Sequence, residues 1–161
     1  MSLSPVPLTP IERGYLHVMR IRRARFPGLL LIAALVADFA DLITLPDWLP
    51  QGSFIVVAVL YALWRVGISP AREWRRWGYH YSGRELHVGQ GWLVRYHTIV
   101  PVSRVQHIDV AQSMVERWFD VATLVLHTAG SEASAVALPG ILVETAEEIR
   151  DDIRARIGAE A

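Results

Sequence analysis

The chain has 161 residues, of which 52% are hydrophobic and 20% are charged, so a very apolar part can coexist with a soluble part. All sixteen basic residues are arginines and balance sixteen acidic residues, which excludes a global electrostatic attraction to nucleic acid. The absence of cysteine excludes disulfides, thiol nucleophiles and cysteine-ligated metals.

Two apolar runs, Gly28 to Leu45 and Phe54 to Ser69, dominate the first half of the chain. Each has 16 to 18 residues, close to the roughly 20 that cross a hydrocarbon core. We therefore predict a two-helix transmembrane hairpin over residues 27–70, after an N-terminal basic segment over residues 1–26. Two buried core helices of a soluble domain are the alternative.

The arginines are concentrated on one side of the predicted hairpin, whereas the short connection over residues 46–53 has one acid and no base. Because short arginine-rich segments stay in the cytoplasm, both termini are predicted to be cytoplasmic. The flanking bases and indoles are predicted to contact the membrane surface, with headgroup recognition or a nucleic-acid platform as alternatives. They are Arg20, Arg22, Arg23, Arg25, Arg72, Trp74, Arg75, Arg76 and Trp77.

Asp38 and Asp41 lie inside the first run, where an ionised carboxylate costs about 2.5–3.5 kcal/mol. Their spacing of three places both on one helical face, so one neighbouring helix could satisfy them. In an antiparallel hairpin Tyr61 falls near the depth of Asp38, and Arg65 lies about a turn and a half nearer the cytoplasm. The alternatives are a bond that locks the hairpin, docking to another membrane subunit, and an ion pathway.

After the second run the pattern changes to short strands separated by turn residues, which is typical of an antiparallel sandwich or barrel. The predicted strands are residues 77–81, 85–88, 92–100, 104–111, 121–128 and 134–138, with turns at Ser82-Gly83 and Gly89-Gln90-Gly91. A final helix follows, because Leu142, Ala146, Ile149, Ile153 and Ile157 share one face. Gly158 is predicted to end it.

Candidate chemistry is sparse in this region. The histidines at positions 80, 87, 97, 107 and 127 have no ligand spacing typical of a metal site, and a solvated sheet edge explains them equally well. The serines lack a nucleophile elbow, and the acids show no catalytic pairing. We therefore expect no catalytic residue, no cofactor and no metal.

Several segments together resemble bacterial PH-domain membrane proteins of the YdbS type. They are residues 99–113 (IVPVSRVQHIDVAQS), 116–119 (ERWF), 125–131 (VLHTAGS), 138–140 (LPG) and Ala146-Glu147. The resemblance covers about residues 15 to 157 and implies two transmembrane helices followed by a cytoplasmic PH-like barrel, here residues 71–161. Where the family usually has Gly-Leu, this chain has Asp120-Val121. Because aspartate tolerates a left-handed conformation, we expect that turn to be preserved.

The resemblance also implies a function: a non-enzymatic interaction or assembly module tethered to the bacterial inner membrane, with itself or a larger related membrane protein as partner. Arg104 and Gln106 alternate along a predicted strand and, with Arg117 in the next loop, form the candidate interaction patch. Bracing of neighbouring strands is the alternative role for these side chains. The alternative function is sensing of anionic membrane lipids, and nucleic acid is not an expected partner.

Overall fold

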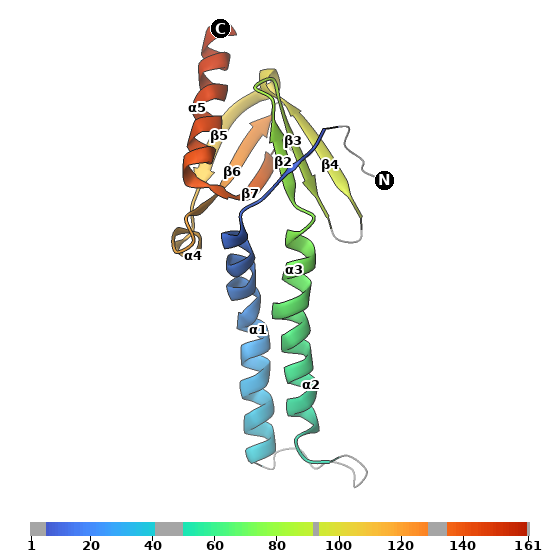
Figure 1. The fold of residues 1–161 in the computed structure, drawn as a ribbon. Coiled ribbons are helices and arrows are strands. Elements are labelled where there is room, and N and C mark those ends of the chain that lie inside the picture. Colours follow the sequence, from blue (N-terminus) through green and yellow to red (C-terminus); the bar gives the residue numbers. More distant parts are fainter. Residues whose placement is uncertain (1–5, 41–49, 92–93, 129–134, 161) are drawn as a thin grey trace. The chain divides into compact units, whose positions relative to one another are not determined.

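The computed structural model describes residues 6–40, 50–91, 94–128 and 135–160. The chain divides into two compact units, one made of residues 1–18 and 72–161 and the other of residues 19–71. N-terminal helices, two antiparallel sheets and a C-terminal helix follow one another along the sequence, as in a PH-like domain (Figure 1).

The unit of residues 19–71 is a helical hairpin. Helix α1 (Arg13–Phe39) enters it, and α2 (Ser53–Ala62), the π-helix η1 (Leu63–Ile68) and α3 (Ser69–Trp74) return as one continuous apolar helix (Figure 1). Of the described residues, only Ser53–Trp74, with 22 residues, forms a helix long and apolar enough to cross a membrane. The first predicted run, Gly28 to Leu45, extends beyond the end of α1 at Phe39, and residues 41–49 lie outside the described residues.

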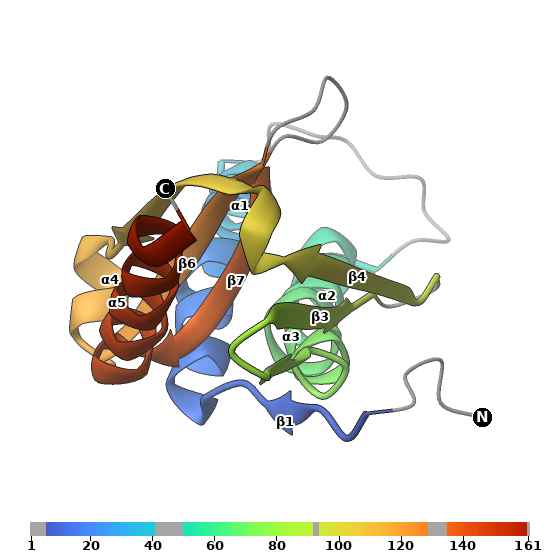
Figure 2. The same ribbon diagram turned by 90° about the horizontal axis from the view of Figure 1, so that it is seen from above.

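The other unit contains two antiparallel sheets. The first has the order β1-β2-β3-β4, and the second has the order β5-β6-β7. Figure 2 labels β3 and β4 of the first sheet and β6 and β7 of the second. The strands are β1 (Thr9–Pro10), β2 (Gly78–Tyr81), β3 (Glu85–Gln90), β4 (Tyr96–Pro101), β5 (Val105–Ala111), β6 (Val121–Thr128) and β7 (Ala135–Leu142). A 3-10 turn η2 (Val102–Arg104) joins the sheets, α4 (Met114–Arg117) follows β5, and α5 (Val143–Glu160) ends the chain.

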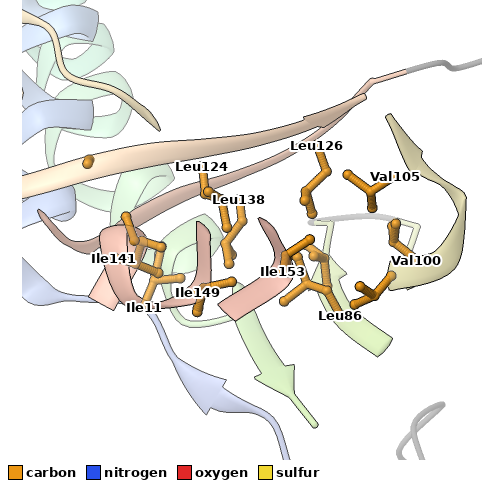
Figure 3. Close-up of a cluster of buried hydrophobic side chains, with 14 residues drawn as sticks. Ile11, Leu86, Val100, Val105, Leu124, Leu126, Leu138, Ile141, Ile149 and Ile153 are labelled. Carbon is orange, nitrogen blue, oxygen red and sulfur yellow. The ribbon is translucent and has the colours of Figure 1, made fainter. Parts of the chain in front are cut away.

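One hydrophobic core serves both sheets and α5. Leu86 and Val100 reach it from the first sheet, and Leu124 and Leu138 from the second (Figure 3). From α5, Ile153 is fully buried, as the predicted apolar face requires. In β6 the buried Leu124 and Leu126 alternate with half-buried residues, because one face of this strand points into the core.

Strand β1 was not predicted. Thr9 pairs with Tyr79 and Pro10 with Gly78, and Ile11 then enters the core with 2% exposure. The hairpin is therefore inserted in sequence between the first two strands of one sheet, and residues 1–18 belong to the sheet unit. The predicted domain boundaries at residues 26 and 70 stay a prediction.

Several predicted element boundaries are wrong. The predicted turn at Gly89-Gln90 is strand, because these residues pair with His97 and Tyr96 and extend the hairpin. Strand β4 begins at Tyr96 rather than at residue 92, and residues 92–93 lie outside the described part. Helix α5 continues through Gly158 to Glu160.

Strand β7 also exceeds its predicted end at residue 138. It continues through Pro139 and Gly140 to Leu142, which is therefore in the strand rather than on the helix. The reason is that β7 is an edge strand, where proline costs no ladder bond. Ala122 and Thr123 of β6 pair with Ile141 and Pro139, so the register shifts there and Gly140 is the extra residue in β7.

The expected left-handed turn at Asp120 is confirmed. Its φ is 52°, the only positive φ of a non-glycine residue among the described residues. Aspartate accepts this conformation with less strain than most residues, so the departure from the family pattern preserves the turn into β6.

The hydrogen bond between Tyr81 and Asp152 connects β2 to α5, and we expect its contribution to stability to depend on pH. The Tyr81 hydroxyl donates to Asp152 Oδ2 at 2.6 Å, and Arg156 Nε donates to the same oxygen at 3.0 Å. Burial and the Asp152 carboxylate raise the pKa of Tyr81 to about 12. The hydrogen bonds from Tyr81 and Arg156 lower the pKa of Asp152.

The raised tyrosine pKa stabilises the fold fully below the unfolded value of about 10, and this contribution disappears as pH rises from about 10 to about 12. The lowered pKa of Asp152 acts at the other end: its contribution is present above about pH 4 and disappears as pH falls. Thermal melts across this range should show the wild type losing its advantage over Tyr81→Phe above about pH 10. An unchanged difference between the two proteins up to pH 12 would contradict the assignment.

Candidate functional site

A basic pocket of about 340 Å³ lies in the sheet unit. Three segments far apart in sequence form it: the arm before β1, the residues after α3, and the tip of the β3–β4 hairpin. The lining residues are Val6, Pro7, Leu8, Arg75, Arg76, Gly89, Gln90, Gly91, Arg95, Tyr96 and His97. A pocket of this size admits a small polar ligand or a lipid headgroup.

Glycines shape one wall of this pocket. A Cβ at Gly89 would lie 2.5 Å from Leu8 Cδ1, so the Leu8 side chain of the N-terminal arm packs directly over this glycine. Gly91 has φ of +120°, and a Cβ there would collide with the carbonyl oxygen of Val94. The close approach of Val94 to residue 91, one residue before Arg95, therefore requires glycine at this position.

The charge of the pocket is one-sided. Arg75, Arg76 and Arg95 are exposed and line it, and no acidic residue stands among its described lining residues. A guanidinium carries five N–H donors, so contacts within the protein leave donors for a ligand. Its planar geometry matches phosphate and carboxylate oxygens. The pocket is therefore suited to an anion.

A histidine chain ends at this pocket. His97, which lines the pocket, has its Nε2 3.3 Å from Nδ1 of His87. His87 is only 7% exposed, and its Nε2 is 3.3 Å from Oε2 of Glu85. The carboxylate of Glu85, two residues before His87 in β3, is thus connected to the pocket through two imidazoles.

The predicted membrane-surface residues occupy different environments. Arg22, Arg25, Arg72, Arg75 and Arg76 are exposed, and Arg75 and Arg76 line the pocket. Trp74 Nε1 donates to the carbonyl oxygen of Glu12 at 2.9 Å, and Trp74 and Trp77 pack against the core. Their indoles therefore help to fold the sheet unit, a role that the sequence did not indicate.

Within the hairpin, Asp38 has a different neighbour from the one expected. Its Oδ1 accepts the Gly52 N–H at 2.9 Å, at the residue that caps the N-terminus of α2. A carboxylate there also complements the helix dipole. Tyr61 instead lies edge-on to Phe26, with ring centroids 6.3 Å apart. Asp38 thus lies at the end of α1, not at mid-span.

A second hydrogen bond joins the two helices at the end of the hairpin opposite Asp38. Arg23 donates to Ser69 Oγ at 3.1 Å, which confirms that the helices run antiparallel. Arg65 is half-buried in the π-helix η1. Asp41 lies outside the described residues.

An apolar groove of about 640 Å³ also runs along the hairpin. It is formed largely by small or apolar residues of α1, α2 and η1, namely Ala24, Pro27, Gly28, Leu31, Val59, Ala62, Leu63, Val66 and Gly67. Arg20 completes the lining, and its Nε is buried with no hydrogen-bond partner among the described residues. Small residues permit close approach of another helix backbone.

The predicted patch of Arg104, Gln106 and Arg117 is not one cluster along β5. All three side chains are exposed, and Val105 between the first two is buried with 4% exposure, as predicted. Arg104, however, belongs to the 3-10 turn η2, and a register shift follows Val105. Arg117 follows the far end of β5, a strand length of about 20 Å away.

Sequence reasoning missed Leu8, Arg95 and His97 as pocket residues. The available signal was the pair of glycines at positions 89 and 91 followed shortly by Arg95, which was interpreted only as a hairpin turn. Pairing of Gly89 with His97 brings the two sides of this hairpin together at the pocket.

The comparisons with known proteins agree with this architecture. Residues 28–157 match the family described as Bacterial PH domain. The chain belongs to the bacterial PH-domain family. This bacterial PH-domain protein is 31% identical to the UPF0699 transmembrane protein YdbS of Bacillus subtilis (strain 168) over 148 residues, which cover 91% of each chain. The expected family is therefore confirmed.

A second relative is a longer protein. The UPF0699 transmembrane protein YdbT of Bacillus subtilis (strain 168) is 32% identical over 101 residues, which cover 62% of this chain but 20% of YdbT. No solved structure matches the chain.

Proposed function

We propose that this protein is a non-enzymatic, membrane-anchored PH-like module that binds anionic headgroups at the cytoplasmic face of the bacterial inner membrane. The observation that carries the proposal is the pocket lined by Arg75, Arg76 and Arg95. Three guanidiniums around about 340 Å³, with no acid among the described lining residues, favour a phosphate-bearing ligand.

The position of this pocket in the sequence supports a membrane ligand. Arg75 and Arg76 follow Ala71, the last residue of the hairpin unit, by only a few residues. If the apolar helix Ser53–Trp74 crosses the bilayer, its end delivers both arginines to the headgroup layer. The second membrane helix and the cytoplasmic orientation of both termini belong to this proposal, on the basis of the flanking arginines.

A binding experiment tests the proposal. Full-length protein is placed in phosphatidylcholine nanodiscs and titrated with soluble short-chain phosphatidylglycerol and phosphatidic acid by calorimetry. A charge-assisted hydrogen bond contributes about 1.5–3 kcal/mol, so Arg75→Gln/Arg95→Gln should weaken binding of the tighter lipid by about tenfold or more. Arg104→Gln removes an exposed arginine outside the pocket and is expected to leave the affinity unchanged.

Wild-type protein that binds neither lipid would contradict the proposal, and so would equal losses in the pocket variant and the Arg104→Gln control. Lipid mass spectrometry of protein purified from its own membrane in mild detergent gives an independent measurement. Enrichment of an anionic lipid that the pocket variant loses is the expected result.

Assembly with another membrane protein is the second candidate function, and two observations favour it. The apolar hairpin groove contains Gly28, Ala62 and Gly67, small residues against which a membrane helix could pack closely. A related sequence also forms one fifth of the larger protein YdbT. The same purification tests this candidate, because a stoichiometric membrane protein among the co-purifying components would support it, and its absence would leave the lipid-binding function alone.

A further inference from the structure

We infer that the basic pocket takes a phosphate monoester and that His97 binds this ligand as a protonated donor, held by His87 and Glu85. The inference rests on the proposed function and specifies the ligand class of the same pocket. The protein takes up one proton when the ligand binds, and His87 and Glu85 act as positioning residues for His97.

The hydrogen-bond chain determines which ring nitrogens can serve a ligand. His87 has both nitrogens engaged, with Nε2 3.3 Å from the Glu85 carboxylate and Nδ1 3.3 Å from His97 Nε2. A carboxylate only accepts hydrogen bonds, so the nitrogen of His87 that faces Glu85, Nε2, must carry the proton. The remaining nitrogen of His97, Nδ1, is the one that this chain leaves for the pocket.

Two protonation states of the hydrogen-bonded pair His87 and His97 follow. When both imidazoles are neutral, His87 Nδ1 accepts from His97 Nε2–H, and His97 Nδ1 is then an acceptor that repels an anion. When the chain gains one proton, His97 carries N–H groups on both nitrogens and Nδ1 becomes a donor. An anion in the pocket therefore selects the protonated state, and the proton comes from the buffer.

The surrounding charges determine when that proton is favourable. The charged groups around His97 are Arg75, Arg76 and Arg95 in the pocket lining and Glu85 beyond His87. Two other described titratable residues lie nearby: His80, whose ring centroid is 6.1 Å from that of His87, and Tyr96 in the pocket lining. A bound dianion favours the proton on His97, because its charge adds to that of Glu85.

The need for a protonated His97 distinguishes phosphate monoesters from phosphate diesters. A phosphate monoester carries a charge of about −1.5 to −2 at pH 7 and three terminal oxygens, whereas a diester carries a single charge and two terminal oxygens. With its larger charge and third terminal oxygen, a monoester neutralises more of the positive charge of three guanidiniums and one imidazolium than a diester does. The same chemistry occurs in a lipid, phosphatidic acid, and in a free metabolite such as glycerol 3-phosphate.

The test uses full-length protein in phosphatidylcholine nanodiscs and calorimetry in two buffers of different ionisation enthalpy. The ligands are short-chain phosphatidic acid, short-chain phosphatidylglycerol and glycerol 3-phosphate. Wild type should prefer phosphatidic acid to phosphatidylglycerol by about tenfold, and should take up about one proton with the monoester. Tighter binding of phosphatidic acid than of glycerol 3-phosphate identifies a lipid ligand, and the reverse order identifies a free monoester.

His97→Asn should retain anion binding through the arginines but lose the proton uptake and most of the preference for the monoester. Glu85→Gln should reduce the proton uptake without removing a pocket residue, which a merely structural role of Glu85 would not do. His107→Asn is the matched control, because His107 is an exposed histidine that pairs with Asp109 at 2.9 Å on the other sheet. It should leave both measurements unchanged.

The outcomes separate the two proposals. Wild-type protein that binds both lipid classes equally, or takes up no proton with the monoester, would overturn this inference and leave headgroup binding intact. Proton uptake that survives in His97→Asn would also overturn it. Failure of every anion to bind would overturn the proposed function itself.

Discussion

Replacement of Gly140 by valine is expected to lower the free energy of unfolding of the sheet unit by about 3 kcal/mol. Gly140 has φ of +73°, and a Cβ at this position would lie 2.6 Å from both Cβ and Cγ of Tyr15. A left-handed β-branched residue costs about 1–2 kcal/mol, and forcing extra atoms into a packed site costs a further 1–3 kcal/mol. Displacing Tyr15 would also strain the hydrogen bond from Glu12 N–H to the Gly140 carbonyl oxygen, now 2.7 Å.

The matched control is Ala137→Val, which adds two methyl groups at an exposed position of the same strand. Valine suits an exposed strand position, so its effect should stay within about 0.5 kcal/mol. Denaturant melts of the full-length proteins in detergent, followed by tryptophan fluorescence, give the comparison. Equal stability of the two variants would show that the segment before the hairpin does not depend on this contact with β7.

The Gly140 contact also explains why the role of the N-terminal segment could not be predicted. The segment joins the sheet through two residues, Thr9 and Pro10, which pair with β2 about seventy positions later. A two-residue strand has no alternating pattern, and a proline reads as a strand breaker. Only the tertiary structure shows that Ile11 belongs to the core. The long strands β5 and β6 and the apolar face of α5, by contrast, carried a clear pattern.

The candidate pocket was predicted only in part. Arg75 and Arg76 were expected at a membrane surface from their place after an apolar run, which is local information. Arg95 and His97 reach the same pocket because β3 extends through Gln90 and sets the register with β4. A prediction that places the turn one or two residues too early gives the wrong register, since strand pairing depends on the position of the turn.

Asp38 shows a similar dependence on a turn. Its depth was estimated from the lengths of the two apolar runs, which placed it opposite Tyr61. The structure starts α2 at Ser53 after the left-handed cap Gly52, and this start places Gly52 beside Asp38. A carboxylate at a helix N-terminus satisfies an orphan N–H, so the cost expected for a mid-span charge does not arise.

The segment Glu116-Arg117-Trp118-Phe119, which supported the family resemblance, contains a residue whose role is structural. Glu116 is 3% exposed, and its carboxylate accepts from the Ser113 N–H at 2.7 Å and from the Thr123 hydroxyl at 3.1 Å. The Glu116 N–H in turn donates to Ser113 Oγ, which completes a capping box for α4. One side chain therefore connects the loop after β5 to β6.

Glu116→Ala is accordingly expected to lower the free energy of unfolding by about 3 kcal/mol, since two partly buried donors lose this buried acceptor at about 1–3 kcal/mol each. Glu116→Gln should cost less than half as much, because the amide oxygen can accept from Ser113 N–H and the Thr123 hydroxyl can accept from the amide nitrogen. Glu148→Ala removes an exposed glutamate of α5 and should change the stability by at most about 0.5 kcal/mol.

Denaturant melts of the three variants rank these effects, and headgroup binding measured below the melting range distinguishes stability from function. Glu116 lies outside the pocket lining, so folded Glu116→Ala should bind anionic lipid with wild-type affinity. Equal destabilisation by Gln and Ala would show that the negative charge matters more than hydrogen-bond acceptance. A loss of lipid binding in the folded Gln variant would instead make this motif part of the ligand site.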